Sequence, residues 1–176
     1  MAFEGRAGEP WFAVRVRSNF ERKAAGLLGS RLGCPVFYPA YSVRSVRRGV
    51  QRLVTRPLFP GYLFLCDDMH EPGTRREVLQ IAGVVGIVGV RGRPTVIEAG
   101  VIESLRILGT RPDQVRPHPF LREGMQVVVR AGPFAGARGL IVRSRGRKPR
   151  LVISIDILGR SVGVPVDPHD VEPDSR

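Results

Sequence analysis

The sequence predicts an α+β protein built in two parts. Up to Leu108, segments with the two-residue repeat of strands alternate with segments that have helical spacing. A proline-rich stretch follows, and beyond it glycine and proline leave no uninterrupted run longer than Arg150–Leu158. These observations predict an N-terminal α/β sandwich with a largely antiparallel sheet, then a linker, then a C-terminal part made of short strands.

The N-terminal part begins with a strand, a helix and a hairpin. Residues 11–17, WFAVRVR, alternate apolar and polar side chains from Phe12 on and predict a strand. Asn19 is a good helix cap, and apolar residues at helical spacing predict a helix that ends at Gly33. Strands at 36–46 and 50–55 then predict a β-hairpin with an arginine-rich tip.

Two further strands and two helices complete this part. Apolar runs predict strands at 62–66 and 84–90, and helical spacing predicts a short helix at 74–81 and a final helix at 98–108. The order of these elements predicts one domain over residues 10–109.

The remainder of the chain has a different pattern. Residues 110–119, TRPDQVRPHP, hold three prolines and little that a core would bury, so they predict a linker. Beyond Phe120, the short strands are predicted at 126–130, 138–145, 151–155 and 161–166. Strands this short, divided by turns, suit a small SH3-like barrel over residues 120–173.

The charge of the chain points to a polyanionic partner. The formal net charge is +12, and all but two of the 28 basic side chains are arginine. Arginine binds phosphate with two parallel hydrogen bonds and stacks on bases, so this composition favours nucleic acid. An arginine-coding bias of the source genome is an alternative cause, although the positive residues also cluster.

Other residue types argue against an enzyme, a metal centre and a membrane protein. Cys34 and Cys66 lack metal-ligand spacing and are expected to be reduced, buried thiols, with one disulfide as the alternative. His70, His118 and His169 have no paired carboxylate or cysteine pattern, so no catalytic residue, metal or cofactor is expected. No apolar run approaches the ~18 residues of a membrane span, and the N-terminus lacks a signal peptide's apolar core, which predicts a cytoplasmic protein.

Residues 57–64, PLFPGYLF, are the most informative segment. They form an aromatic run with a rigid Phe-Pro-Gly turn, and an arginine-rich stretch without acidic residues precedes them. Aromatic anchors beside a cationic flank predict a surface that grips a protein next to a nucleic acid. The alternative is that the apolar side chains of this run simply fill a sandwich core.

These segments, in this order, resemble the NusG family of transcription elongation factors. The matching stretches begin with WFAVRVRSNFERKAAGLL and continue through PLFPGYLF and GVVGIVGV. LREGMQVVVRAGPFAGARGLIV then resembles a KOW motif, and ISIDILGRSVGVPV resembles the closing strands of the family barrel. The resemblance implies an α/β N-terminal domain plus a KOW barrel, and PLFPGYLF is closer to the specialised RfaH-like paralogues than to the FFPGY form of general NusG.

The activity implied by the resemblance is non-enzymatic. The N-terminal domain of the family sits on RNA polymerase and changes pausing and termination, and the barrel recruits a partner such as Rho or a small-subunit ribosomal protein. The chain is accordingly expected to be a monomeric elongation or antitermination factor. The alternative is a ribosome- or RNA-binding KOW protein, which would use a second basic hairpin formed by Arg143, Arg145, Arg147, Lys148 and Arg150.

The resemblance also implies two surfaces for the polymerase. The groove for the clamp helices would be formed by Phe59, Pro60, Tyr62, Phe64, Ile102 and Leu105. The gate loop would meet the start of the short helix at Thr74, Arg75 and Arg76, for which an ordinary exposed helix end is the alternative.

Two further sets of residues are candidate contacts. Upstream or non-template DNA is expected to meet six arginines, Arg15, Arg17, Arg44, Arg47, Arg48 and Arg52. Pairing of the first two with Glu21 or other acids, and a merely solvated face for the rest, are the alternatives. The partner of the barrel is expected at a loop formed by Ile157, Leu158, Gly159 and Arg160, where general NusG proteins commonly place an aromatic residue instead of Leu158.

Overall fold

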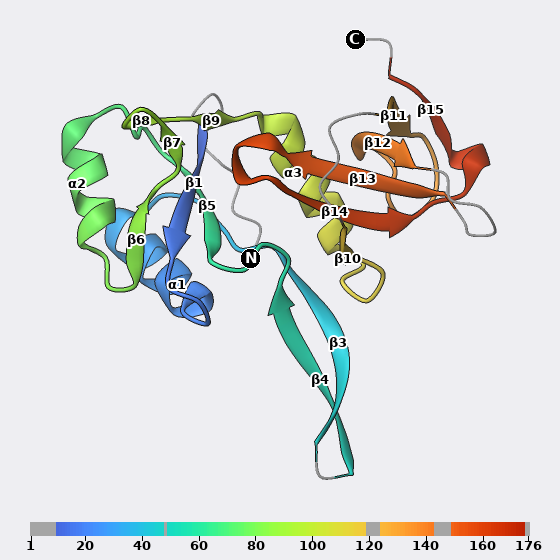
Figure 1. Cartoon of the computed structure of the whole chain (residues 1–176), viewed down its shortest axis with the longest axis horizontal. Coiled ribbons are helices and arrows are strands. Elements are labelled where there is room, and N and C mark those ends of the chain that lie inside the picture. The colour runs from blue at the N-terminus through green and yellow to red at the C-terminus, as the bar shows by residue number, and fades with distance from the viewer. Residues whose placement is uncertain (1–9, 48, 119–123, 143–148, 175–176) are drawn as a thin grey trace. The chain divides into compact units, whose positions relative to one another are not determined.

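The computed structural model describes residues 10–47, 49–118, 124–142 and 149–174. The chain forms helices and antiparallel sheets that group into two compact units (Figure 1). One unit contains the residues up to Tyr38 and Phe59–Ala99, and the other contains Pro39–Leu58 and the chain from Gly100 on. Compactness is not independent folding, so the expected domain ranges stay predictions.

The first unit is built on a sheet with the strand order β2-β5-β1-β6, to which β9 adds by pairing with β1. Its strand pairings are antiparallel. The strands are β1 (Trp11–Val16), β2 (Val36–Phe37), β5 (Tyr62–Cys66), β6 (Val84–Ile87) and β9 (Val96–Ile97). The strand expected at 84–90 is divided after Ile87, and its second part, β7 (Gly89–Val90), pairs with β8 (Arg93–Pro94).

Two helices, α1 (Glu21–Leu32) and α2 (Pro72–Gln80), supply side chains to the core on one face of this sheet. Alternate strand residues join them, as the two-residue repeat requires. The buried set includes Phe12, Val14, Val16, Ala24, Leu28, Leu63, Leu65 and Val78. The expected strands at 11–17 and 62–66 are therefore confirmed, and one face of each is buried against helices.

The start of α1 differs from the sequence prediction. Phe20, not Asn19, is the N-cap, and no side chain caps the helix. Asn19 instead adopts a left-handed φ of 62° between Arg17 and Phe20, whose N–H donates to the Arg17 carbonyl. The predicted end at Gly33 is confirmed, because its left-handed conformation lets its N–H bond to the carbonyl of Gly29.

Glu21 makes a long-range contact at this helix start. Its carboxylate accepts a hydrogen bond of 2.8 Å from the N–H of Gly61, 40 residues away, and only 3% of Glu21 is exposed. The Gly61 carbonyl in turn accepts from the N–H of Val16 at 2.8 Å. Gly61 has a φ of 83°, a left-handed conformation that favours glycine. These bonds fix the turn inside PLFPGYLF to both α1 and β1.

The second unit contains a six-stranded antiparallel sheet with the order β10-β14-β13-β12-β11-β15. Its strands are β10 (Arg116–His118), β11 (Met125–Val129), β12 (Arg138–Val142), β13 (Arg150–Ile155), β14 (Arg160–Pro165) and β15 (Val171–Pro173). Four of them occupy the expected positions, whereas β10 and β15 were not expected. β10 lies inside the expected linker, where it pairs with Ser161–Gly163 of β14. Part of that proline-rich stretch is therefore a strand.

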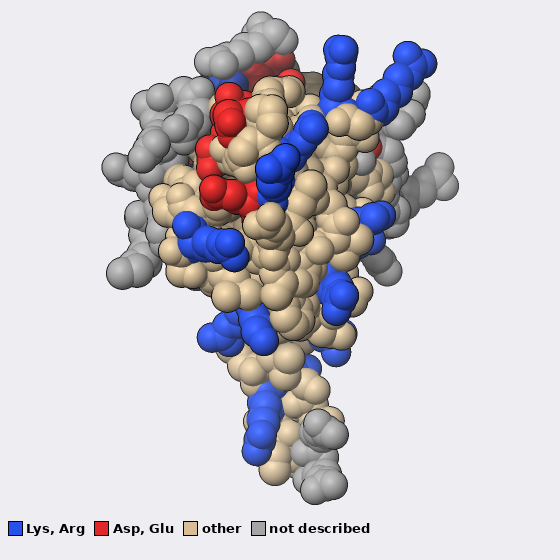
Figure 2. Space-filling view, turned by 90° about the vertical axis from the view of Figure 1, so that its left-hand side faces the viewer, with Lys and Arg blue, Asp and Glu red and all other residues tan. Residues whose placement is uncertain are grey.

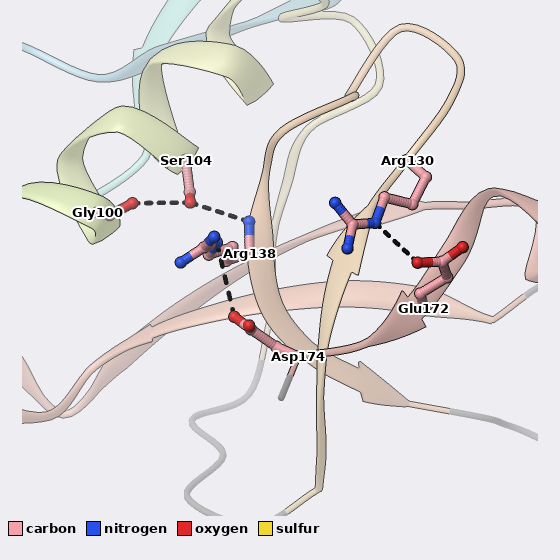
Figure 3. Close-up of polar contacts among 6 residues, drawn as sticks. All are labelled: Gly100, Ser104, Arg130, Arg138, Glu172 and Asp174. Atoms are coloured by element: carbon pink, nitrogen blue, oxygen red, sulfur yellow. Dashed lines mark hydrogen bonds and ion pairs between the residues drawn. The ribbon is translucent and has the colours of Figure 1, made fainter. Parts of the chain in front are cut away.

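Polar contacts hold α3 (Ala99–Gly109) and β15 to this sheet (Figure 3). The Ser104 hydroxyl donates to the Gly100 carbonyl at 2.8 Å and accepts from the N–H of Arg138 at 3.0 Å. The side chain of Arg138 also lies 3.6 Å from the Asp174 carboxylate. A second ion pair of 2.8 Å joins Arg130 to Glu172 in β15, but both side chains are largely exposed. Such a surface pair contributes about 1 kcal/mol at most.

The expected hairpin is present as β3 (Ala40–Arg47) and β4 (Val50–Pro57). Among the described residues, these two strands pair only with each other. The single strand expected at 36–46 is broken before Ala40, where Pro39 has no N–H for a ladder. The Pro39 carbonyl accepts from the N–H of Leu58 at 2.9 Å and so closes the base of the hairpin.

We expect Glu21→Ala to lower the free energy of unfolding by about 1–3 kcal/mol, because it leaves the buried N–H of Gly61 without an acceptor. Glu21→Gln keeps an acceptor oxygen and should cost less. Urea unfolding of both variants tests this, with the exposed Glu77→Ala as a matched control that should stay within about 0.5 kcal/mol of the wild type. Equal losses for Glu21→Ala and Glu77→Ala would contradict the prediction.

Candidate functional site

The rings of PLFPGYLF form an aromatic cluster on the sheet face opposite α1 and α2. Phe64 alternates with Leu63 and Leu65, which face the helices. Its ring meets that of Phe59 edge to face, with centroids 5.7 Å apart, and lies 6.2 Å from that of Phe37. Phe59 and Phe64 are buried, so neither ring is presented to solvent.

Two other members of the run are accessible. Pro60 is exposed and Tyr62 is half-buried. Of the four residues of this run expected in the polymerase groove, only these two are accessible, and the role of the run in binding stays a prediction. The Glu21–Gly61 bond described above ties this turn to the start of α1.

Arg15 lies directly beside Tyr62. The register of β1 pairs Arg15 with Tyr62 of β5 on one side and with Gly86 of β6 on the other. Residues paired in this way share a face of the sheet. Arg15 is exposed, and a Cβ at Gly86 would meet no atom of the described residues within 4 Å. The row therefore presents a phenol ring, a guanidinium group and an open glycine position.

Sequence reasoning grouped Arg15 with the nucleic-acid contacts rather than with Tyr62. The period of β1 alone shows which residues share its faces, but the neighbour in β5 depends on the register, which the sequence did not reveal. Arg17 is also exposed, just beyond the end of β1, where its N–H donates to the Gly83 carbonyl at 2.8 Å.

The helix α2 starts at a capped N-terminus. Glu71 is the N-cap, and its carboxylate accepts from the N–H of Thr74, with Pro72 in the first turn. The helix thus begins two residues before the predicted start. Thr74 and Arg75 are half-buried, and Arg76 is exposed. Hydrogen bonds from backbone N–H groups lower the pKa of Glu71, and the bond from Thr74 has a larger effect than the bond from Gly73.

The helix α3 carries the other residues expected in the polymerase groove. Ile102 and Leu105 are both buried in this structure, as is Leu108 one turn further on. The helix itself confirms the predicted segment at 98–108. The face expected to wall a groove is therefore not exposed to solvent, and its role in binding stays a prediction.

The hairpin carries exposed arginines. Arg44 in β3 and Arg52 in β4 are both exposed, and so is Arg56 near the base. Arg47 belongs to β3, but its side chain lies outside the described part of the chain, as does the whole of Arg48. Residues 143–148 of the second basic hairpin also lie outside it.

The loop expected to bind a partner of the barrel connects β13 to β14. It forms a 3-10 turn, Asp156–Leu158, which Gly159 closes by donating its N–H to the Asp156 carbonyl at 3.0 Å. Gly159 has a φ of 58°. Leu158 and Arg160 are half-buried, and the side chain of Ile157 is not among those described.

Both cysteines lie at buried positions of the first unit. Cys34 and Cys66 are buried thiols that form no disulfide. Burial, and to a lesser extent the nearby Asp67, raises the pKa of Cys34 to about 12. A thiol of this kind stays protonated near neutral pH. The residues that the structure describes hold no cluster of three or more His, Cys, Asp or Glu side chains suited to a metal ion. Within the same ranges, none of the helices has the length and apolar character needed to cross a membrane.

Comparison with known families identifies the N-terminal part of the chain. The NusG family model, described as "Transcription termination factor nusG", matches residues 9–106. The chain belongs to the NusG family. The resemblance expected from the sequence motifs is thereby confirmed.

Curated NusG relatives extend this match along nearly the whole chain. The transcription termination/antitermination protein NusG of Escherichia coli K12 is 29% identical over 176 residues, covering 92% of this chain and 94% of the relative. The NusG protein of Thermus thermophilus is 30% identical over 174 residues, covering 89% and 94%. Such relatives indicate a transcription termination/antitermination factor. The RfaH-like specialisation stays a prediction.

A solved structure supports the fold. The structure titled "Domain interaction in Thermotoga maritima NusG" aligns with a TM-score of 0.56 and covers 94% of this chain and 97% of that chain. The identity is only 19%, so the likeness supports the combination of helices and antiparallel sheets and carries no functional detail.

The cap of α2 should respond to acid. Because the folded state lowers the pKa of Glu71, the cap stabilises α2 above the ordinary pKa of the carboxyl group. This stabilisation is lost as the pH falls through the lowered pKa that Glu71 has in the folded state. An NMR pH titration should therefore show the Thr74 amide resonance moving with the Glu71 carboxyl group at a pH below the ordinary pKa of a glutamate side chain.

Glu71→Gln is the matched variant, because it keeps an oxygen near Thr74 but cannot titrate. Its Thr74 resonance should not follow that low-pH step. A wild-type Glu71 midpoint at or above the ordinary value of a glutamate side chain would contradict the assigned cap.

Proposed function

We propose that this NusG-family protein is an elongation factor that binds RNA polymerase through its N-terminal part and modulates pausing and termination. Its curated relatives are termination/antitermination proteins, which supports the process. The observation that carries the binding surface is the row of Tyr62, Arg15 and Gly86 beside the exposed Pro60. In this proposal the protein acts as a monomer in the cytoplasm, where bacterial transcription takes place.

The proposed polymerase contact combines an apolar and a charged element. Tyr62 and Pro60 offer accessible apolar surface, and Phe59 and Phe64 of the same run are buried with their rings edge to face. Arg15 adds a cation beside the ring of Tyr62, which suits an acidic residue on the clamp helices. Anchors that are held rigid before binding lose little conformational entropy on docking. By family resemblance, Ile102 and Leu105 of α3 are also proposed as contacts of the polymerase.

A second polymerase contact is proposed at the start of α2. Thr74, Arg75 and Arg76 form its first turns, and the Glu71 cap fixes the direction in which the helix begins. The exposed Arg76 and the half-buried Arg75 would meet acidic or carbonyl groups of the gate loop.

The second unit is proposed to contain a KOW barrel of the SH3-like type that recruits a further partner. The loop from Ile157 to Arg160 is fixed by the 3-10 turn and by Gly159, so it presents a constant shape. Leu158 supplies an apolar contact there in place of a ring. Rho and a small-subunit ribosomal protein are the two candidates that the family resemblance offers.

Upstream or non-template DNA is the proposed nucleic acid. Arg44 and Arg52 are exposed on the hairpin, and Arg17 is exposed at the end of β1. Guanidinium groups at these places suit phosphate, and no acidic residue occurs in the hairpin sequence between Ala40 and Pro57.

Binding of the full-length protein to a purified bacterial RNA polymerase elongation complex tests the proposal. We expect Arg15→Glu and Tyr62→Ala each to weaken binding by at least about tenfold, since each removes an anchor of the contact. Arg31→Glu makes the same charge change at an exposed position of α1 and should leave the affinity within about twofold of the wild type.

Circular dichroism and urea unfolding establish that the variants are folded. Wild-type protein that fails to bind the polymerase would contradict the proposed function. The ribosome- or RNA-binding alternative would then be favoured, with binding to ribosomal subunits as its positive result. An equal loss in Arg31→Glu would mean that net charge, rather than this surface, drives the interaction.

A further inference from the structure

The β3–β4 hairpin carries arginine on both of its faces. Residues that are paired across an antiparallel ladder share a face. Arg52 is paired with Ser45 and Arg56 with Tyr41, which puts these two arginines on one face. Arg44 is paired with Leu53, one position along the ladder from Arg52, and so lies on the opposite face. A ribbon that rested on the body of the protein would keep its charges on the outer side only.

Both faces of the hairpin are also open to solvent. Every residue of β4 from Val50 to Arg56 is exposed, including 71% of Leu53, and Val46 in β3 is 65% exposed. A two-stranded ribbon that leaves large aliphatic side chains in water gains little stability from them. Exposed apolar side chains of this kind, set among cations, indicate a surface that becomes buried on binding.

The charge of the ribbon specifies the chemistry of the partner. Its sequence from Ala40 to Pro57 contains five arginines and no acidic residue. On the face that Figure 2 shows, the described part of the ribbon carries basic side chains and no acidic ones. At its base the guanidinium carbon of Arg116 lies 5.8 Å from the centre of the Tyr41 ring, which adds a cation to the face that holds Arg56. This arrangement complements a polyanion.

Because the arginines lie on both faces of the hairpin, a duplex fits it better as a partner than a single strand does. A single strand that runs along the ribbon would meet one face, and the arginine on the other face would remain in water. A groove of a duplex has a phosphate backbone on each side, so both faces would be used. The major groove of B-form DNA is about 12 Å wide and admits a two-stranded β-ribbon. The major groove of A-form RNA is deep and narrow and does not.

The base of the hairpin is held in a defined position. The N–H of Ser42 donates to the Pro112 carbonyl at 3.1 Å, and β10, which begins at Arg116, pairs with β14. Together with the Arg116–Tyr41 contact, these bonds tie the hairpin base to residues 112–118. A ribbon fixed at its base loses less conformational freedom when it enters a groove.

We propose that the hairpin inserts into the major groove of duplex DNA. Arg44 contacts one phosphate backbone, Arg52 and Arg56 contact the other, and Leu53 and Val46 lie against base edges. This inference rests on the proposed function, because it specifies the form of DNA that the hairpin meets. The family resemblance named upstream DNA and the non-template strand as alternatives, and the present proposal specifies duplex DNA.

Fluorescence anisotropy with the full-length protein tests the proposal. The probes are a DNA duplex of about 20 base pairs, one of its strands alone and an RNA duplex of the same sequence. We expect the DNA duplex to bind most tightly. Arg44→Gln and Arg52→Gln, on opposite faces, should each weaken that binding about threefold to tenfold and reduce the slope of log affinity against log salt by about 0.9. Arg31→Gln, on α1, is the control and should change neither.

Dimethyl sulfate methylation of the bound DNA duplex locates the ribbon. Insertion should protect guanine N7, which lies in the major groove, and Leu53→Ser should reduce that protection. Protection of adenine N3 alone would mean minor-groove binding and would overturn the proposal. The proposal would also be overturned if Arg52→Gln weakened duplex binding and Arg44→Gln did not, because one face of the hairpin would then be enough for binding. Tighter binding of the single strand than of the duplex would overturn it as well.

The polymerase-binding assay separates this inference from the proposed function. Polymerase binding by a wild-type protein that prefers the single strand would refute groove insertion and leave the proposed function intact. Duplex binding without polymerase binding would refute the proposed function and leave the chemistry of the hairpin as inferred.

Discussion

The buried hydrogen bond between the Gly61 N–H and the Glu21 carboxylate is the contact on which the presentation of the aromatic run depends. It joins the first residue of α1 to the turn before β5, and the adjacent bond from Val16 to Gly61 extends the link to β1. The helix, the turn and the central strand are thereby held in one arrangement. Tyr62 and Arg15 lie beside each other because β1 and β5 keep this register.

Local patterns were sufficient where a segment's own side chains determine its structure. The apolar run at 62–66 indicated a strand, and Gly33 indicated where α1 ends. The cap at Asn19 could not be judged in this way. Glu21, the first residue of α1, bonds to a residue 40 positions away, and no local pattern contains that partner.

The elements that the sequence did not reveal are defined by their neighbours. β10 and β15 are three residues each, too short to show a repeat, and they exist because β14 and β11 offer free edges for pairing. The candidate site could be predicted only in part for the same reason. Arginine and tyrosine were recognised as binding residues, but the row that joins Arg15, Tyr62 and Gly86 comes from pairings between strands distant in sequence.

The ladder of β3 and β4 has a consequence for how factors of this kind diversify. In the described part of the chain neither strand pairs with a third, and the exposed positions of β4 contribute nothing to either sheet. Insertions or substitutions at the tip therefore change the length and the chemistry of the ribbon at little cost in folding free energy. New target preferences can arise there by drift and selection, while the scaffold that carries the ribbon remains under separate constraint.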